Sequence, residues 1–222
     1  MLQTGEQDRR GATRPDTARR IVEAAGAIFA DSGYRHTTIR AICRRAGVNV
    51  AAVNYYFGGK KNLYLAVLTG LRARAVEEHP LDLGDLTTLP PDERLHRFVR
   101  TFLSRVLDKG DGARFAKLMA QELIQPTAAF DEIIENIINP AFAFLATTVR
   151  QLFKKPMSPE KVGLCCVSIV GQIFYFYMTT PVIRKLFDKG TFEDRDIEAV
   201  ATHVTRFSLY AIDRMATQNE GE

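Results

Sequence analysis

The side chains best suited to binding a polyanion fall in one short segment of the chain, between residues 38 and 60. Arg40 can form two hydrogen bonds with the edge of a guanine, or a charged contact with a phosphate. Phosphate contacts position a protein on nucleic acid without reading its sequence. Arg44 and Arg45 fit a solvated face as well as they fit phosphate ligands, and Tyr56 is a better candidate than Tyr55. The side chains expected to contact phosphates are Asn54, Tyr55, Tyr56 and Lys60.

Two short helices, over about residues 38–46 and 50–57, must position these side chains. They meet at Ala46-Gly47-Val48, where Gly47 can adopt the positive φ that a sharp corner needs. The small Ala46 lets the helices approach, and Val48 fills the space between them. A support helix precedes them and should end at Asp31-Ser32-Gly33. The segment is therefore predicted to form a helix-turn-helix, with Phe57 in its core.

In a helix-turn-helix, the N-terminal residues of the second helix enter the major groove, while the first helix crosses the backbone. Residues 50–52 would then face the groove, where small apolar side chains favour close approach and contacts with thymine methyl groups. Thr37 or Thr38 should cap the first helix, and Asn49 the second. The candidate DNA-binding residues are Thr38, Arg40, Asn49, Val50, Ala51, Ala52, Asn54, Tyr55, Tyr56 and Lys60.

The charge is unevenly distributed along the 222 residues. Residues 1–75 carry 13 Lys and Arg against 5 Asp and Glu, a net charge of +8, whereas residues 76–222 carry 17 against 21, a net charge of −4. A basic N-terminal third on an acidic remainder is typical of a DNA-binding head on a body that avoids polyanions. Charge alone fits a solvated basic surface equally well.

The composition argues against several classes of protein. The four histidines are far apart, and no nucleophile elbow, phosphate-binding loop or HExxH motif is present, so no enzyme and no catalytic residue is expected. The three cysteines lack metal-binding spacing and are interpreted as small buried thiols, so neither a metal nor a cofactor is expected. There is no uninterrupted apolar run of about 18 residues and no secretory signal. A cytoplasmic protein without a membrane partner is therefore expected.

All regular structure is expected to be helical, because apolar residues recur at helical spacing and no stretch shows the alternation of a strand. The predicted fold is all-α, with about nine helices. A flexible basic tail is expected over residues 1–14, and a three-helix DNA-binding domain over residues 15–62. A connecting helix over residues 63–78 should lead to a larger ligand-binding and dimerisation domain over residues 79–222.

The helix predicted over residues 160–180 is apolar on almost every side, so it must be covered all round. Contact with a second copy of the chain is the simplest way to cover it. This helix and the last one, over about residues 193–216, would then pack against the same two helices of the second copy in a four-helix bundle. The alternative is that the helix forms the central core of one chain. The candidate dimer residues are Val167, Val170, Gly171, Phe174, Val200, Val204, Phe207 and Ala211.

The larger domain also holds enough aromatic and methionine side chains to line an adaptable apolar cavity for a small molecule. Gln121, Glu122 and Gln172 are the expected polar anchors. Many of the candidates fit an ordinary core equally well, and Pro140 should kink or divide the helical segment that carries several of them. The candidate ligand-binding residues are Phe98, Phe102, Phe115, Met119, Glu122, Phe130, Ile134, Phe142, Gln172, Phe174 and Tyr177.

Residues 17–65 resemble the DNA-binding domain of the tetracycline-repressor (TetR) family. The shared pattern comprises Phe29-Ala-Asp-Ser-Gly-Tyr, Thr37-Thr38-Ile39, Ile42, Ala46-Gly47-Val48, Tyr56-Phe57-Gly58-Gly59-Lys60 and Leu63. The chain departs from the family pattern at Asn49, where Ser is commoner, and at Asn54, where Tyr is common. Within the family, residues 49–56 and the Gly-Gly-Lys-Lys-Asn-Leu after Phe57 are most similar to the branch of CecR-like regulators.

The resemblance implies a homodimer with one DNA-binding head per subunit, a palindromic double-stranded operator, and repression relieved by a small-molecule effector. Two other functions remain open from the residues alone. One is a DNA-binding nucleoid protein without ligand control, and the other is a protein-interaction scaffold whose helix-turn-helix no longer binds DNA.

Overall fold

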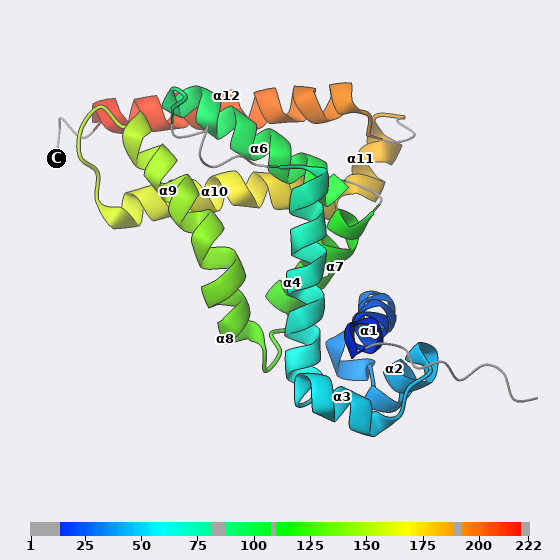
Figure 1. The fold of residues 1–222 in the computed structure, drawn as a ribbon. Helices are drawn as coiled ribbons and strands as arrows, with labels where there is room; N and C mark the ends of the chain where they lie inside the picture. The colour runs from blue at the N-terminus through cyan, green and yellow to red at the C-terminus, as the bar shows by residue number, and fades with distance from the viewer. Residues whose placement is uncertain (1–13, 81–87, 108–109, 189–191, 219–222) are drawn as a thin grey trace, which may run out of the picture. The chain divides into compact units, whose positions relative to one another are not determined.

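The computed structural model describes residues 14–80, 88–107, 110–188 and 192–218. Within these ranges all regular elements are helices (Figure 1), which confirms the all-α prediction. The predicted basic tail lies outside the described residues except for Arg14, where the first helix begins. The chain forms two compact units, which are Met1–Leu68 with Thr127–Ala129, and Thr69–Pro126 with Phe130–Glu222.

The first unit contains α1 (Arg14–His36), α2 (Ile39–Ala46), α3 (Val50–Phe57) and the first part of α4 (Lys60–Glu78). Gly33 interrupts the regular turns of α1 with a φ of 74°, at the position where the sequence predicts the end of the support helix. All four helices contribute to one core, in which the edge of the Phe29 ring meets Tyr64 at 4.9 Å between centroids. The fully buried side chains of this core include Ile21, Ala25, Phe29, Ile42, Val53, Leu63 and Leu68.

The second unit contains the rest of α4, then α6 (Pro91–Leu107), α7 (Asp111–Ile124), α8 (Phe130–Ile133), the π-helical η1 (Ile134–Ile138), α9 (Asn139–Leu152), α10 (Pro159–Met178), α11 (Thr180–Leu186) and α12 (Asp194–Gln218). Pro140 lies in the first turn of α9, directly after the π-helical segment. Because proline has no backbone N–H, it is tolerated in a first turn and disturbs the hydrogen bonds before it. The sequence predicts that Pro140 kinks or divides this segment; next to it the turns change from π-helical to α-helical, while the backbone of Ile138 and Asn139 stays right-handed helical.

The core of the second unit lies among α6, α9, α10 and α12 (Figure 1). Helix α12 packs along α6, and α10 packs against α9, α6 and α12. Val204 is fully buried within this core, and Val200 packs against it. Naming Val204 as a dimer residue was therefore wrong, because its side chain is already covered by its own chain. The buried side chains from α10 are Val162, Cys165, Cys166, Ile169 and Ile173.

The three cysteines are free and buried, as the sequence interpretation requires. Burial raises the pKa of each thiol, and the pKa of Cys166 rises to about 11 through burial first and the neighbouring Cys165 second. The reactive thiolate form is therefore disfavoured at neutral pH. These residues act as small apolar side chains in the two cores.

Helix α10 differs from expectation in one respect, because it meets the length and composition criteria for a membrane-spanning helix among the described residues. The sequence prediction was that no such helix is present. The inner side chains Cys166, Ile169 and Ile173 are at most 3% exposed, so α10 is built into the core of its unit. A single helix that meets these criteria is weak evidence for a membrane span.

Candidate nucleic-acid interface and ligand site

Two capped helix N-termini define the candidate DNA-binding edge. Thr38 Oγ1 accepts a hydrogen bond from the Ala41 backbone N–H at 3.1 Å, and Asn49 Oδ1 accepts one from the Ala52 N–H at 2.9 Å. Thr38 rather than Thr37 is therefore the cap of α2. Each cap satisfies one of the N–H groups that a helix start leaves without a partner. These contacts fix the residues at which α2 and α3 begin. They therefore also fix which side chains form the N-terminal turn of α3.

We expect Asn49→Ala to lower the free energy of unfolding by about 1 kcal/mol, because it removes the side-chain acceptor at the start of α3. Chemical denaturation followed by circular dichroism measures this change. Asn49→Ser is the matched control, because serine keeps an acceptor at the same position and should stay close to the original stability. Equal stability of the alanine and serine variants would contradict the capping role.

The conformation of Gly47 and two hydrogen bonds fix the corner between α2 and α3. Gly47 adopts a left-handed conformation, with a φ of 65° and a ψ of 39°. The N–H of Val48 donates to the Cys43 carbonyl at 3.0 Å, and Arg20 Nη2 of α1 donates to the Ala46 carbonyl at 2.6 Å. A Cβ atom on Gly47 would lie 3.0 Å from that same Arg20 nitrogen. Sequence reasoning missed Arg20, whose only signal is its place on the support helix.

The exposed side of α3 matches most of the predicted groove residues. Val50 is 42% exposed, and Ala51 and Asn54 are exposed as well. Ala52 is half-buried, and the next residue, Val53, is fully buried in the core. The end of the helix that would enter a groove therefore carries few hydrogen-bonding side chains, as the sequence indicates.

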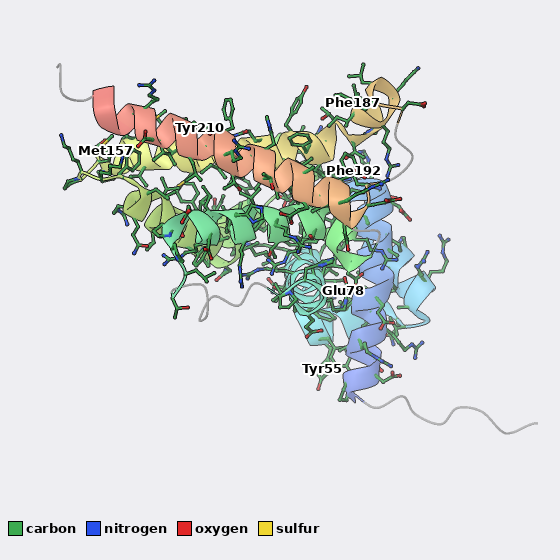
Figure 2. All side chains as sticks on the ribbon, turned by 90° about the horizontal axis from the view of Figure 1, so that it is seen from above. Tyr55, Glu78, Met157, Phe187, Phe192 and Tyr210 are labelled. Carbon is green, nitrogen blue, oxygen red and sulfur yellow. The ribbon has the colours of Figure 1, made fainter. Side chains whose placement is uncertain are left out.

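The aromatic residues at the end of α3 are arranged differently from expectation. Tyr55 is 64% exposed, whereas Tyr56 and Phe57 are half-buried. The Tyr55 and Tyr56 rings meet edge to face at 5.1 Å between centroids. Phe57 is thus not the fully enclosed core residue that the sequence predicts. Tyr55, labelled in Figure 2, offers the larger exposed surface of the two tyrosines.

The two basic candidates have different surroundings. Arg40 is exposed in the first turn of α2, where its guanidinium group is accessible to a partner. Lys60, the first residue of α4, is half-buried with its ammonium nitrogen 4.4 Å from the centre of the Tyr34 ring. Burial lowers the pKa of Lys60. An aromatic face partly offsets that cost by attracting the cation.

Comparison with known families matches both units of the chain. A family model described as bacterial regulatory proteins of the tetR family matches residues 21–67. A model described as the C-terminal domain of the HTH-type transcriptional dual regulator CecR matches residues 91–212, which is more than half of the chain. The chain belongs to the TetR family. This TetR-family chain is accordingly a transcriptional regulator with a helix-turn-helix, and not an enzyme.

Individual relatives agree with this assignment. The dual regulator CecR of Shigella flexneri is 26% identical over 196 residues, which cover 84% of this TetR-family chain and 87% of CecR. The regulator SrpR of Pseudomonas putida is 35% identical over 97 residues, 44% of this chain and 41% of SrpR.

Solved structures show the same fold. A TetR-like regulator from Rhodococcus sp. RHA1 has a TM-score of 0.64 at 19% identity, covering 90% of this chain and 99% of its own. FadR of Bacillus subtilis, solved in complex with stearoyl-CoA, has a TM-score of 0.63 at 20% identity, and the match covers 86% of this chain and 97% of FadR. At these identities the likeness concerns the fold alone.

The predicted ligand-binding residues do not gather at one place. Phe98 is 2% exposed and stacks on Phe102 at 4.4 Å between ring centroids, as part of the core of the second unit. Glu122 is 1% exposed on α7. Gln172 instead lines a mainly apolar hollow of about 470 Å³ between α10 and α12. The remaining candidates are half-buried, namely Phe102, Phe115, Met119, Phe130, Ile134, Phe142, Phe174 and Tyr177.

The predicted dimer residues fall partly on an exposed apolar surface. Val167 and Phe207 are each 60% exposed, and Phe207 and Ala211 line the hollow together with Gln172. Phe174, by contrast, is half-buried. We call this surface the α10–α12 face, and its exposed large apolar side chains are Leu164, Val167, Val170, Tyr175, Met178, Phe207, Tyr210 and Met215. Tyr210, labelled in Figure 2, is one that sequence reasoning missed.

Proposed function

We propose that this TetR-family regulator is a homodimeric repressor in the cytoplasm that binds a palindromic operator and is released by a small, largely apolar or aromatic effector. The observation that carries the proposal is the combination of an exposed helix-turn-helix in one unit with an exposed apolar face in the other. The first supplies the contact with DNA, and the second supplies the contact with a second copy. Two identical heads then match two identical half-sites.

The α10–α12 face supports dimerisation. Leu164, Val167 and Tyr175 recur at helical spacing on α10 and are each at least 60% exposed. On α12, Phe207 and Tyr210 are exposed to a similar extent. A contiguous apolar surface of this kind is unusual on a monomer and typical of an interface. A second copy explains it better than a lipid bilayer does, because the opposite side of α10 is committed to the core of its own unit.

The chemistry of the helix-turn-helix supports a particular division of labour on DNA. Val50 and Ala51 can approach thymine methyl groups but cannot form bidentate hydrogen bonds. Arg40 can bind a guanine or a phosphate, and Tyr55 and Tyr56 can contact phosphates. Recognition of the operator then depends on Arg40, on methyl contacts and on the shape of the DNA.

If Arg40 contacts a phosphate, Arg40→Ala should weaken binding to all DNA sequences by a similar factor. We expect the slope of log affinity against log salt concentration to fall by about one. Fluorescence anisotropy titrations at several salt concentrations measure both quantities. Arg97→Ala, at an exposed position of α6 in the other unit, is the control. An unchanged affinity and slope for Arg40→Ala would favour a scaffold whose helix-turn-helix does not bind DNA.

Release by an effector requires that the effector bind one conformational state of the protein better than another. Operator binding needs recognition helices separated by one turn of DNA, about 34–36 Å, or by a multiple of it. We propose that the effector stabilises a state with another separation. A matched pair of structures, one with effector and one with DNA, with equal separation of the recognition helices would contradict this mechanism.

A screen tests the regulatory half of the proposal. The regulator is first bound to DNA fragments that it selects from a random pool, and small molecules are then tested for release. We expect apolar or aromatic compounds to release the DNA while circular dichroism shows unchanged helix content. Stable, sequence-specific binding that no compound in a broad set affects would support DNA binding without ligand control.

A further inference from the structure

Arg20 of the support helix α1 contacts the peptide group at which α2 ends. Its Nη2 donates to the Ala46 carbonyl at 2.6 Å. This carbonyl is one of the acceptors that the end of a helix leaves without a partner inside the helix. The half-buried guanidinium group also places a positive charge at the negative end of α2. Arg20 therefore stabilises the end of α2 from a neighbouring helix.

The peptide group between Ala46 and Gly47 is bonded at both of its polar ends. Its carbonyl accepts from Arg20, and its N–H, which belongs to Gly47, donates to the Cys43 carbonyl. Because a peptide group is planar, the two bonds together fix its orientation. The chain leaves this plane at Gly47 in the left-handed conformation that turns it from α2 toward α3. The Arg20 contact thus acts where the direction of α3 is set.

Further hydrogen bonds connect this corner to the first turn of α3. The Val48 N–H donates to the Cys43 carbonyl at 3.0 Å. The Cys43 thiol donates to the Asn49 carbonyl at 3.5 Å, and that carbonyl also accepts from the Ala52 N–H at 3.2 Å. The partners in these bonds belong to α2, to α3 or to the corner between them, whereas Arg20 belongs to α1. Arg20 therefore ties the whole corner to the support helix.

The neighbouring Arg19 provides a comparison within the same helix. Arg19 is exposed, and its Nη2 binds the Asp16 carboxylate of α1 at 3.0 Å. The two arginines carry the same charge, but the contact of Arg19 stays within α1 and the contact of Arg20 reaches α2. Removing either side chain costs one positive charge, and only the second removal frees the Ala46 carbonyl.

We propose that Arg20 is a positioning residue for DNA recognition, which holds the corner between α2 and α3 against α1 so that the first turn of α3 meets the operator bases in one orientation. Contacts of Val50 and Ala51 with thymine methyl groups are short-range and depend on this orientation. Attraction to the phosphate backbone is electrostatic and independent of sequence, so it survives a small displacement of α3. This inference rests on the proposed function, because it requires a specific operator.

DNA binding by full-length Arg20→Ala and Arg19→Ala proteins tests the proposal. The probes are a fragment that the original protein selects from a random pool and a duplex of the same length with scrambled sequence. We expect Arg20→Ala to bind the selected fragment at least about five-fold more weakly than Arg19→Ala does, since one charge-assisted hydrogen bond is lost. Both variants should bind the scrambled duplex within about two-fold of each other, because they have the same net charge. Fluorescence anisotropy titrations measure all four affinities.

The conservative variant Arg20→Lys should recover most of the lost affinity. Arg20 donates to the Ala46 carbonyl through one nitrogen, and a lysine ammonium group offers a single donor with the same charge. If Arg20→Ala loses helix content by circular dichroism, Arg20→Gln takes its place, with Arg19→Gln as its control. Arg20→Lys that binds the selected fragment as weakly as the alanine or glutamine variant would contradict the role of this contact.

Two other results would overturn the proposal. One is a lower free energy of unfolding in Arg20→Ala with unchanged affinity of the folded protein for the selected fragment, which would leave Arg20 a structural role alone. The other is equal weakening on both DNAs, with the slope of log affinity against log salt concentration lowered by about one relative to Arg19→Ala. That result would make Arg20 a phosphate ligand.

Failure of the proposed function gives a different result. If the original protein binds the selected and scrambled duplexes equally, the operator-specific regulator is contradicted, and this inference with it. If the original protein prefers the selected fragment and Arg20→Ala keeps the full preference, the positioning role of Arg20 is overturned and the proposed function stands.

Discussion

Introducing glutamate at both Val167 and Phe207 is expected to convert the regulator to a monomer and to lower its affinity for the operator by at least about a hundred-fold. Both side chains are 60% exposed on the α10–α12 face. In a symmetric dimer each substitution places two carboxylates in the interface, where burying them without partners is costly. Each head alone would then bind its half-site without the gain from a linked second head.

Analytical ultracentrifugation and operator titration measure the two effects. Ala143→Glu is the matched control, because it adds the same side chain at an exposed position of α9, away from the α10–α12 face. The control should remain dimeric and bind the operator normally. A double variant that stays dimeric would show that the two copies meet elsewhere on the chain.

Gly47→Ala is expected to give the second large effect, a loss of operator affinity of about ten-fold or more accompanied by destabilisation of the first unit by about 1–2 kcal/mol. Alanine at a φ of 65° is strained, and its Cβ would press on the Arg20 nitrogen that binds the Ala46 carbonyl. Relief of this strain moves α3 relative to α2, and α3 carries the residues that face the groove.

The same chemical change elsewhere in the unit should act in the opposite direction. Gly26 lies inside α1, and a Cβ there would make an ordinary 3.5 Å contact with Val67. Gly26→Ala is therefore expected to stabilise the unit by up to about 1 kcal/mol. Hydrogen exchange of the α2 and α3 amides measures both variants. Similar protection in the two would mean that the conformation of Gly47 does not matter.

The sequence predicts the helix-turn-helix well because its determinants are local. Thr38 and Asn49 act on N–H groups three residues away, and Gly47 is recognisable from its position between two short helices. Ser158 and Pro159 mark the start of α10 in the same way. Such signals need no knowledge of the rest of the chain.

Features that depend on distant contacts were not predictable in this way. Arg20 donates to the carbonyl of Ala46, which lies 26 residues further along the chain. Arg105 donates to the carbonyl of His79, which lies 26 residues earlier. Val204 and Phe207 are both apolar residues of α12, yet one is buried and the other exposed. Helical spacing alone cannot decide which apolar face of a helix meets its own chain. The short helix α11 lacks a strong periodic pattern and was missed.

The candidate ligand site shows the same limit. A list of aromatic and methionine residues cannot separate the core residue Phe98 from the half-buried Phe102, because both are compatible with a packed interior. Gln172 was expected to anchor a ligand among them, but it lies in the hollow on the α10–α12 face. The hollow belongs to the surface that we propose a second copy covers.

Selection of bound fragments from a random DNA pool, followed by footprinting of the strongest one, tests the central claim most directly. The account predicts one protected palindrome, with half-site centres separated by about one helical turn or a multiple of it. It also predicts that the protection is lost in the Val167 and Phe207 double variant. Uniform protection along the DNA, or a selected site without twofold symmetry, would contradict the account of this chain as a dimeric, operator-specific regulator.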